Sequence, residues 1–304
     1  MSTLPPQDFL FLPIPSAPDK PLDLTLLTSS TWTYCGPLLP LDDNTSNNDN
    51  VESPPNPSSS LFPPSFHAWT AQTISGPQPS AQLLTHLLPL LRAAHAFLIS
   101  QNMHHYWLTI RATKPTTDFD FPRWHTDDNF FIPPRQPDSD PDEDGAEGLW
   151  KLCATLQGRG TLFFSDGKVA RRALKEAKAE ARKEQERKPH VCTTVRCAAC
   201  GRTSEWVREE VAGRLARVEE EGKGRKALVV QPVVGKEMAF FRIGGKEGAV
   251  HSEPRHDGDR VFVNIIPGTE EELRGLTRRW GMEFPRSWSL GVPGMGSVAA
   301  SARS

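Results

Sequence analysis

The chain has 304 residues, 37% of them hydrophobic, with 35 basic and 37 acidic side chains. This composition predicts one large folded domain or two small ones and excludes collagen, coiled-coil and wholly disordered classes. The near balance of charge lacks the basic excess of nucleic-acid-binding domains, so nucleic acid is not an expected partner. No apolar run approaches the roughly 20 residues of a membrane span, and residues 1–8 lack the basic start of a secretory signal. We therefore expect a cytoplasmic protein without membrane contact, a nuclear location staying open.

The first part of the chain differs in composition from the rest. Of the 28 prolines, 13 precede His67, and only two basic residues occur before position 111. Residues 1–66 alternate short apolar patches with Pro, Ser, Asn and Asp, and 42–60 are almost entirely polar and turn-forming. We predict a proline-rich arm over 1–66, with a disordered loop at about 42–60, ahead of a single domain over 67–290.

Helical and strand-like patterns follow one another along that domain. Leucines at helical spacing predict a helix over 80–101, which Pro89 should kink or split. Alternation predicts a strand over 106–112 and two strands within 150–164, joined at the glycines 158–160. Further strands are predicted over 227–234, 237–243 and 260–266.

A charged segment interrupts the strands. Residues 171–188 hold 12 charged side chains in 18 positions, separated mainly by alanines, and 202–222 look similar. This pattern is typical of solvated helices. We therefore predict a helical-hairpin insertion over about 166–226, and a disordered tail over 291–304.

Two histidines and one aspartate form the first candidate site. His125 and Asp127 share a face of an extended segment, because strand side chains alternate with period two, and an imidazole and a carboxylate can bind one metal ion from one side. His251, far along the chain, supplies a third ligand of the kind used by the facial triad of non-haem Fe(II) oxygenases. His256 is an alternative to His251, which we prefer because it closes an apolar stretch whereas His256 lies in a charged Pro/Gly loop.

An arginine follows the last of these histidines at the start of a predicted strand. Arg260 lies nine residues after His251, and Phe262 and Asn264 share its face of the strand. A guanidinium in this position can bind a carboxylate with two parallel hydrogen bonds. Arg260 is therefore a candidate to bind an anionic ligand near the three candidate metal ligands.

The order of four motifs resembles a known family. His-x-Asp at 125–127, Gly-x-Gly-Thr-x-x-Phe at 158–164, a Pro-x-x-Gly turn leading to phenylalanine at 232–241, and His-x-x-Pro-x-x-x-Gly-x-Arg at 251–260 are similar to the jelly-roll core of Fe(II)/2-oxoglutarate-dependent dioxygenases. Segments 122–127, 152–161 and 248–266 resemble most closely, in its fungal form, the group called domain of unknown function 1826. The resemblance covers about 107–267 without the insertion.

The resemblance implies a fold and an activity. The fold is α+β and mainly β, a double-stranded β-helix (jelly roll) with covering N-terminal helices and the helical-hairpin insertion. The activity is the 2-oxoglutarate-dependent oxidation of a small molecule, an amino acid or a secondary metabolite. The implied iron ligands are His125, Asp127 and His251, and the implied 2-oxoglutarate contacts are Arg260, Asn264 and Arg111.

Three cysteines within the insertion form a second candidate site. Cys197-x-x-Cys200-Gly is the turn of zinc knuckles, and Cys192 with His190 would complete four zinc ligands. Metal binding is favoured over disulfides in an intracellular chain. Such a zinc would be structural and remote from the iron, and the alternative is three free thiols in a turn between two helices.

Two other functions stay open at this point. One is a non-catalytic, cupin-like metal-binding protein, a sensor or a zinc-handling protein. The other is a protein that binds a partner through the charged hairpin, where 171–188 hold eight basic and four acidic residues. The sequence indicates neither the oxidised substrate nor the oligomeric state.

Overall fold

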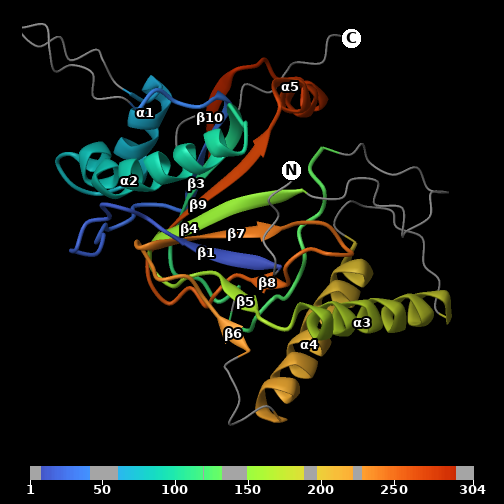
Figure 1. Cartoon of the computed structure of the whole chain (residues 1–304). Coiled ribbons are helices and arrows are strands. Elements are labelled where there is room, and N and C mark those ends of the chain that lie inside the picture. Colours follow the sequence, from blue (N-terminus) through green and yellow to red (C-terminus); the bar gives the residue numbers. More distant parts are fainter. Residues whose placement is uncertain are drawn as a thin grey trace, which may run out of the picture.

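A seven-stranded antiparallel sheet lies at the centre of the computed structural model (Figure 1). The structure describes residues 8–41, 61–118, 120–131, 149–187, 197–221 and 228–291. The strands of this large sheet are β1 (Phe9–Pro13), β2 (Ser30–Pro37), β3 (His105–Thr113), β4 (Trp150–Gln157), β7 (Glu237–Arg242), β9 (Arg260–Gly268) and β10 (Arg286–Leu290). Their order is β1-β7-β4-β9-β3-β2-β10, and every neighbouring pair is antiparallel.

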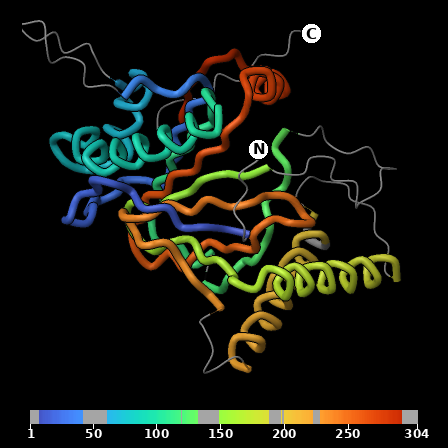
Figure 2. Tube along the Cα trace, in the orientation of Figure 1, coloured from blue at the N-terminus to red at the C-terminus, as the bar shows by residue number. Residues whose placement is uncertain are grey.

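A second, smaller sheet lies beside the large one (Figures 1 and 2). Its strands are β5 (Leu162–Phe164), β6 (Val229–Val230) and β8 (His251–Ser252), in the order β6-β5-β8. An isolated antiparallel bridge between His125 and His251 adds one more segment next to β8. Phe163 of β5 packs on Phe241 of the large sheet, with ring centroids 5.2 Å apart. Aromatic packing therefore joins the two sheets.

Alternation along the strands gives the large sheet two different faces. One face belongs to the main hydrophobic core, and the other turns toward the second sheet. In β3, Leu108 and Ile110 are fully buried in the main core, whereas Thr109 and Arg111 point to the opposite side. The same alternation separates Val261 and Val263 of β9 from Arg260, Phe262 and Asn264.

Two helices cover the core face of the large sheet (Figure 1). They are α1 (Pro64–Thr73) and α2 (Pro79–Ser100), and each has a proline in its first turn, where no backbone donor is lost. Leu83, Leu87 and Leu91 of α2 are fully buried. The predicted helix is confirmed, but the predicted split is wrong, because α2 continues through Pro89.

A third helix, α5 (Glu270–Arg279), follows the last strand of the core. Thr269 and Glu272 form a reciprocal capping box at its start, and acidic residues fill its first turn while Arg278 and Arg279 lie in its last. These charges match the helix dipole and stabilise both ends. The apolar periodicity of the sequence does not predict α5, α1 or β10.

The predicted insertion is a pair of helices between β5 and β6. They are α3 (Gly167–Arg187) and α4 (Ala198–Glu221), and Figure 2 shows the pair projecting from the side of the second sheet. Alanines of α3 pack on Val211 and Leu215 of α4. The guanidinium of Arg214 joins the helices by pairing with Glu176 at 3.0 Å and with Glu180 at 2.8 Å.

The α+β class with antiparallel strands is confirmed, and the expectation of a mainly β chain is wrong. Helices account for 37% and strands for 27% of the structure, because the insertion and the covering helices are long. Strands β1 and β2 of the expected arm are part of the large sheet. The expected disordered loop at 42–60 and the tail after Gly291 lie outside the described residues.

One helix in the described part of the chain, α2, has the length and apolar composition of a membrane span. Seven of its 22 residues are buried, and they pack in the main hydrophobic core of this chain. Helices that cover a sheet commonly have this composition, so the length and composition of α2 are weak evidence for a membrane.

Truncating the core side of α2 should destabilise the fold. Leu87 is fully buried, and Leu87→Ala removes its contacts and leaves a cavity, so we expect the free energy of unfolding to fall by about 3 kcal/mol. Ile99 on the same helix is 55% exposed, and Ile99→Ala should change it by less than about 0.5 kcal/mol. Urea unfolding of both variants measures the difference, and equal losses would contradict this assignment of faces.

A buried histidine should make stability depend on pH. His95 of α2 packs against Tyr106, with ring centroids 5.4 Å apart, and burial lowers its pKa to about 4. Since the unfolded chain then takes up the proton at higher pH than the folded chain, stability should fall as pH drops from about 6.5 to about 4. His95→Met should remove the contribution of His95 and make this decline in urea-unfolding midpoints shallower, while His251 and His256, whose pKa values burial also lowers to about 4, keep theirs. His104→Met, at an exposed position, should leave the decline unchanged. Identical slopes for both variants would refute the assignment.

Candidate metal centre

Three predicted ligands meet between the two sheets. The nitrogen and oxygen ligand atoms of His125, Asp127 and His251 all lie within 4.8 Å of one another, and no other group of this kind occurs among the described residues. Nε2 of His251 is 3.4 Å from Oδ2 of Asp127, and Nε2 of His125 is 4.0 Å from Oδ1. The predicted grouping is therefore present in the fold.

Backbone pairing brings the two histidines together. The N–H of His125 donates to the carbonyl of His251 and the N–H of His251 donates to that of His125, both at 2.9 Å. Their rings lie 4.4 Å apart. Asp127 follows His125 by two residues in an extended segment, so its carboxylate lies on the same side.

Each imidazole is oriented by a second hydrogen bond. Nδ1 of His125 donates to the carbonyl of Arg123 at 2.8 Å, and Nδ1 of His251 donates to that of Ala249 at 3.0 Å. Because a carbonyl oxygen only accepts, the proton of each neutral ring lies on Nδ1. Both Nε2 lone pairs are therefore available to a metal ion, in the arrangement typical of metal-ligating histidines.

The protonation states also suit a metal ion. Burial lowers the pKa of His251 to about 4, so this ring is neutral at pH 7, as a ligand must be. Burial raises the pKa of Asp127, but the positive charge of Lys151 and its hydrogen bond outweigh that effect and hold the pKa below its usual value. Lys151 is only 7% exposed and forms an ion pair with Asp127 Oδ2. Its ammonium also lies 5.0 Å from the centre of the Phe241 ring.

Hydrophobic packing supports the two histidines from behind. Trp124 and Val250, the residues immediately before His125 and His251, are both buried. They belong to one cluster with Phe164 and the apolar side chains of α3 and α4. The helix pair therefore packs directly behind the segments that carry the imidazoles.

A cavity of about 240 Å³ opens beside the three ligands. Strands β3, β4, β7 and β9 of the large sheet line one side of it, and His251 of β8 lines the other. Aromatic rings of Phe130, Phe241 and Phe262 form apolar walls. Polar groups other than the three ligands come from Thr109, Arg111, Lys151, Cys153, Thr161, Glu253, Arg260 and Asn264.

Arg260 is the most deeply buried guanidinium of the cavity, with 2% exposure. Its Nε donates to the carbonyl of Arg159 at 3.0 Å, and its Nη2 donates to the hydroxyls of Thr155 and Thr161 at 3.3 Å. Burial lowers its pKa to about 10, which leaves it charged. Within the described residues it forms no ion pair, although the negative charge of Glu253 in the same cavity acts on it.

A glycine makes room for this arginine. Gly158 has φ +84°, and a Cβ there would lie 3.0 Å from Cβ of Arg260. Only glycine combines this backbone conformation with so close an approach at low cost. The Gly-x-Gly-Thr motif is thus explained by its first glycine, which lies against Arg260, and by its threonine, which accepts from the guanidinium.

The structure brings most of the predicted site residues to this one cavity. Arg111 of β3 and Asn264 of β9 line it together with Arg260 and the three ligands. His256 is buried nearby but lies outside the ligand group, which agrees with the preference for His251. Trp124 and Trp150, which are near the ligands in the sequence, pack in hydrophobic clusters.

The predicted zinc ligands are only partly described. Cys192 and His190 lie outside the described residues, while Cys197 precedes α4 and Cys200 lies in its first turn. The zinc site therefore stays a prediction.

Two charged residues of the cavity were missed from the sequence. Lys151 begins a period-two series with Cys153 and Thr155 within an otherwise apolar strand, and all three face the cavity or Arg260. Glu253 follows His251 by two residues, the same spacing that was used for His125 and Asp127. Both signals were present, but Asp127, the ion-pair partner of Lys151, lies on a separate segment of the chain, and Glu253 forms no ion pair within the described residues.

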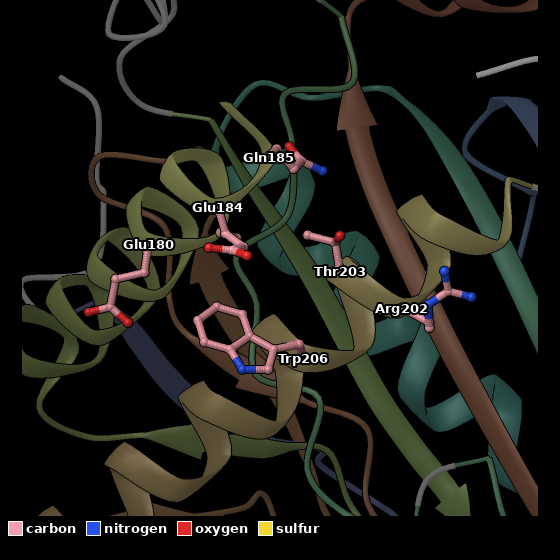
Figure 3. A pocket seen from close by; sticks show the side chains of 7 residues that line it. Glu180, Glu184, Gln185, Arg202, Thr203 and Trp206 are labelled. Carbon is pink, nitrogen blue, oxygen red and sulfur yellow. The ribbon is translucent and has the colours of Figure 1, made fainter. Parts of the chain in front are cut away.

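A second hollow lies between α3 and α4 (Figure 3). It measures about 770 Å³, and Figure 3 shows Glu180 and Glu184 of α3 on one side and Trp206 of α4 on the other. The lining holds two glutamates and one arginine, Arg202. This mixed charge does not favour a nucleic-acid phosphate.

Comparison of the chain with protein-family models, with curated proteins and with solved structures finds no match. The site is therefore interpreted from its own geometry.

Removing one ligand should abolish metal binding at this centre. Asp127→Asn keeps the size of the side chain but removes its charge. Losing a group that only orients a metal ligand commonly weakens binding by up to ~100-fold, so losing a ligand should raise the Kd for Co(II) by ~100-fold or more. Isothermal titration measures it. Asp128→Asn, at the exposed neighbouring position, should bind like the unaltered protein, and equal Kd values for both variants would contradict the assignment. A further equivalent that survives Asp127→Asn but is lost in Cys197→Ser would reveal the predicted zinc site.

Proposed function

We propose that this chain is an Fe(II)/2-oxoglutarate-dependent oxygenase that oxidises a small molecule. The observation that carries the proposal is a single cavity with two kinds of group in its lining. One is the His125/Asp127/His251 group, and the other is the buried guanidinium of Arg260, which forms no ion pair within the described residues. A metal ion fits the first and a carboxylate fits the second, so the cavity suits a ligand that joins them.

The strand order supports a double-stranded β-helix as the scaffold. Along the chain, the strands alternate between the two sheets. The large sheet contains β3, β4, β7 and β9. The elements between them lie in the small sheet or at its edge, and they are the His125 segment after β3, β5 and β6 after β4, and β8 after β7. Seven strands and the His125 segment, shared in this way between two antiparallel sheets, support a jelly roll. Strands β1, β2 and β10 extend the large sheet on both sides.

The ligand set fits non-haem iron. Two neutral imidazoles and one carboxylate on one side leave coordination positions for other ligands, the pattern of Fe(II) oxygenases. When bound, iron with 2-oxoglutarate supplies the oxidation of the substrate by O₂, coupled to conversion of 2-oxoglutarate to succinate and CO₂. Lys151 holds one oxygen of Asp127 and so fixes the orientation of that carboxylate.

Arg260 would bind the distal carboxylate of 2-oxoglutarate. Its guanidinium is already oriented by Thr155, Thr161 and the Arg159 carbonyl, so little side-chain entropy is lost on binding. A buried charge without a counter-ion is costly, and a carboxylate ligand relieves that cost. Asn264 and Arg111 line the same cavity and stay as further candidate contacts.

The remaining walls would exclude water. Phe130, Phe241 and Phe262 surround the polar groups with apolar surface. Electrostatic interactions strengthen in such a site because bulk solvent does not screen them. The aromatic walls therefore favour tight, oriented binding of small anionic and polar ligands.

Turnover of 2-oxoglutarate tests the proposal. Protein loaded anaerobically with Fe(II) should form succinate from 2-oxoglutarate once O₂ and ascorbate are added, slowly without a substrate. Arg260→Met should raise the KM for 2-oxoglutarate by ~100-fold, because the charge-assisted contact with the buried guanidinium is lost. Arg255→Met removes an exposed arginine and should leave that KM unchanged.

The opposite result favours the non-catalytic alternative. Tight binding of Zn(II) in preference to Fe(II), no succinate, and identical ligand binding by Arg260→Met and the unaltered protein would together overturn the oxygenase proposal. They would support a cupin-like metal-binding protein instead.

A further inference from the structure

We propose that the substrate oxidised in this cavity is a free amino acid, bound as a zwitterion with its ammonium group on Glu253 and its carboxylate on Arg111. This inference rests on the proposed function, because it names the substrate class of the same site. It starts from Glu253, a charge that neither metal ligation nor the Arg260 site uses, and it assigns Arg111 and Asn264 to the substrate instead of to 2-oxoglutarate.

Glu253 is the acidic side chain of the cavity that forms no ion pair with a described side chain. The two acidic residues in the lining are Asp127 and Glu253, and Asp127 is paired with Lys151. The carboxylate of Glu253 accepts a hydrogen bond from its own backbone N–H, and its charge has no described side chain of opposite charge in ion-pair contact. A partly buried carboxylate in this state favours a cationic ligand.

A second acceptor points to the same kind of ligand. The Oδ1 atom of Asn264 is buried and has no hydrogen-bond partner among the described residues. An ammonium group carries three donor hydrogens and can serve several acceptors, whereas a carboxylate or an ether carries none. Glu253 and Asn264 both line the cavity, so its unused groups include two acceptors that call for a donor.

Arg111 supplies the opposite charge near the opening. It is exposed, unlike the buried Arg260, and lies on β3 opposite Phe262 of β9. Its charge acts on Glu253, yet no ion pair joins the two side chains within the described residues. Two separated, opposite charges at one small cavity match the two poles of an amino acid, and Arg260 stays free for 2-oxoglutarate.

The size of the cavity limits the substrate. At about 240 Å³ it is smaller than the roughly 300–1,000 Å³ common for ligand sites. A molecule of a few carbon atoms between the two charged groups fits such a space better than a peptide or a polycyclic metabolite.

Ligand binding to the inert complex tests this inference without turnover. The full chain is loaded anaerobically with Co(II) and 2-oxoglutarate, and its Tm is measured with each of the protein amino acids and with their N-acetyl derivatives. We expect at least one amino acid to raise the Tm by roughly 3 °C or more at saturation. Its N-acetyl derivative, which lacks the ammonium charge, should give no shift.

Variants assign the two poles of the ligand. Glu253→Gln should raise the Kd of that amino acid by ~100-fold and Arg111→Met by ~10-fold, as for buried and exposed charge pairs. Glu283→Gln removes an exposed glutamate outside the cavity and should leave the Kd unchanged. The N-acetyl comparison uses the unaltered protein, so it decides the question even if Glu253→Gln does not fold.

The outcomes separate this inference from the proposed function. If Co(II) and 2-oxoglutarate alone raise the Tm but no amino acid adds to the shift, the amino-acid assignment is overturned and the oxygenase proposal stands. Equal shifts from an amino acid and its N-acetyl derivative also overturn it. If Co(II) and 2-oxoglutarate themselves leave the Tm unchanged, both proposals fail.

Discussion

The two backbone hydrogen bonds between His125 and His251 are the contact on which the rest of the site depends. They join segments that are far apart in the chain and bring both imidazoles to one place, with Asp127 two residues beyond. Each ring is then turned by a bond from Nδ1 to a nearby carbonyl, which leaves Nε2 unprotonated. Because backbone groups do this work, the position of the ligands depends on strand pairing more than on neighbouring side chains. The polar cavity lies between the large sheet and the small sheet, which this pairing extends by the His125 segment.

The large sheet serves two purposes through its alternation. On β3, β4 and β9 every second residue packs under α2, and the residues between them line the cavity. A single strand such as β9 therefore supplies Val261 and Val263 to the core and Arg260 and Asn264 to the site. The stability of the core and the geometry of the site are linked at each of these strands, because moving one face of a strand moves the other.

Much of this arrangement could be predicted from local pattern. The spacing of His125 and Asp127, and of Arg260 and Asn264, follows from the two-residue repeat of a strand, and the leucine repeat gave α2. Lys151 and Glu253 could not be assigned in the same way, because the role of each charged residue depends on groups that the fold brings to it from other parts of the chain. Helix α5 was missed although its capping box is present in the sequence, since its few buried residues give a weak apolar repeat.

The hydrophobic cluster behind the histidines gives the inserted helices a structural role. Trp124 and Val250 are buried against α3 and α4, and each directly precedes a metal-binding candidate. Local opening of the helix pair would expose these two side chains to water and release the backbone on which His125 and His251 are carried. The free energy that keeps the hairpin folded and the free energy of metal binding are thus coupled. A substitution that destabilises the hairpin would therefore weaken binding of a metal by these candidate ligands, and a bound metal would stabilise the hairpin. This coupling would operate although no residue of α3 or α4 lines the cavity.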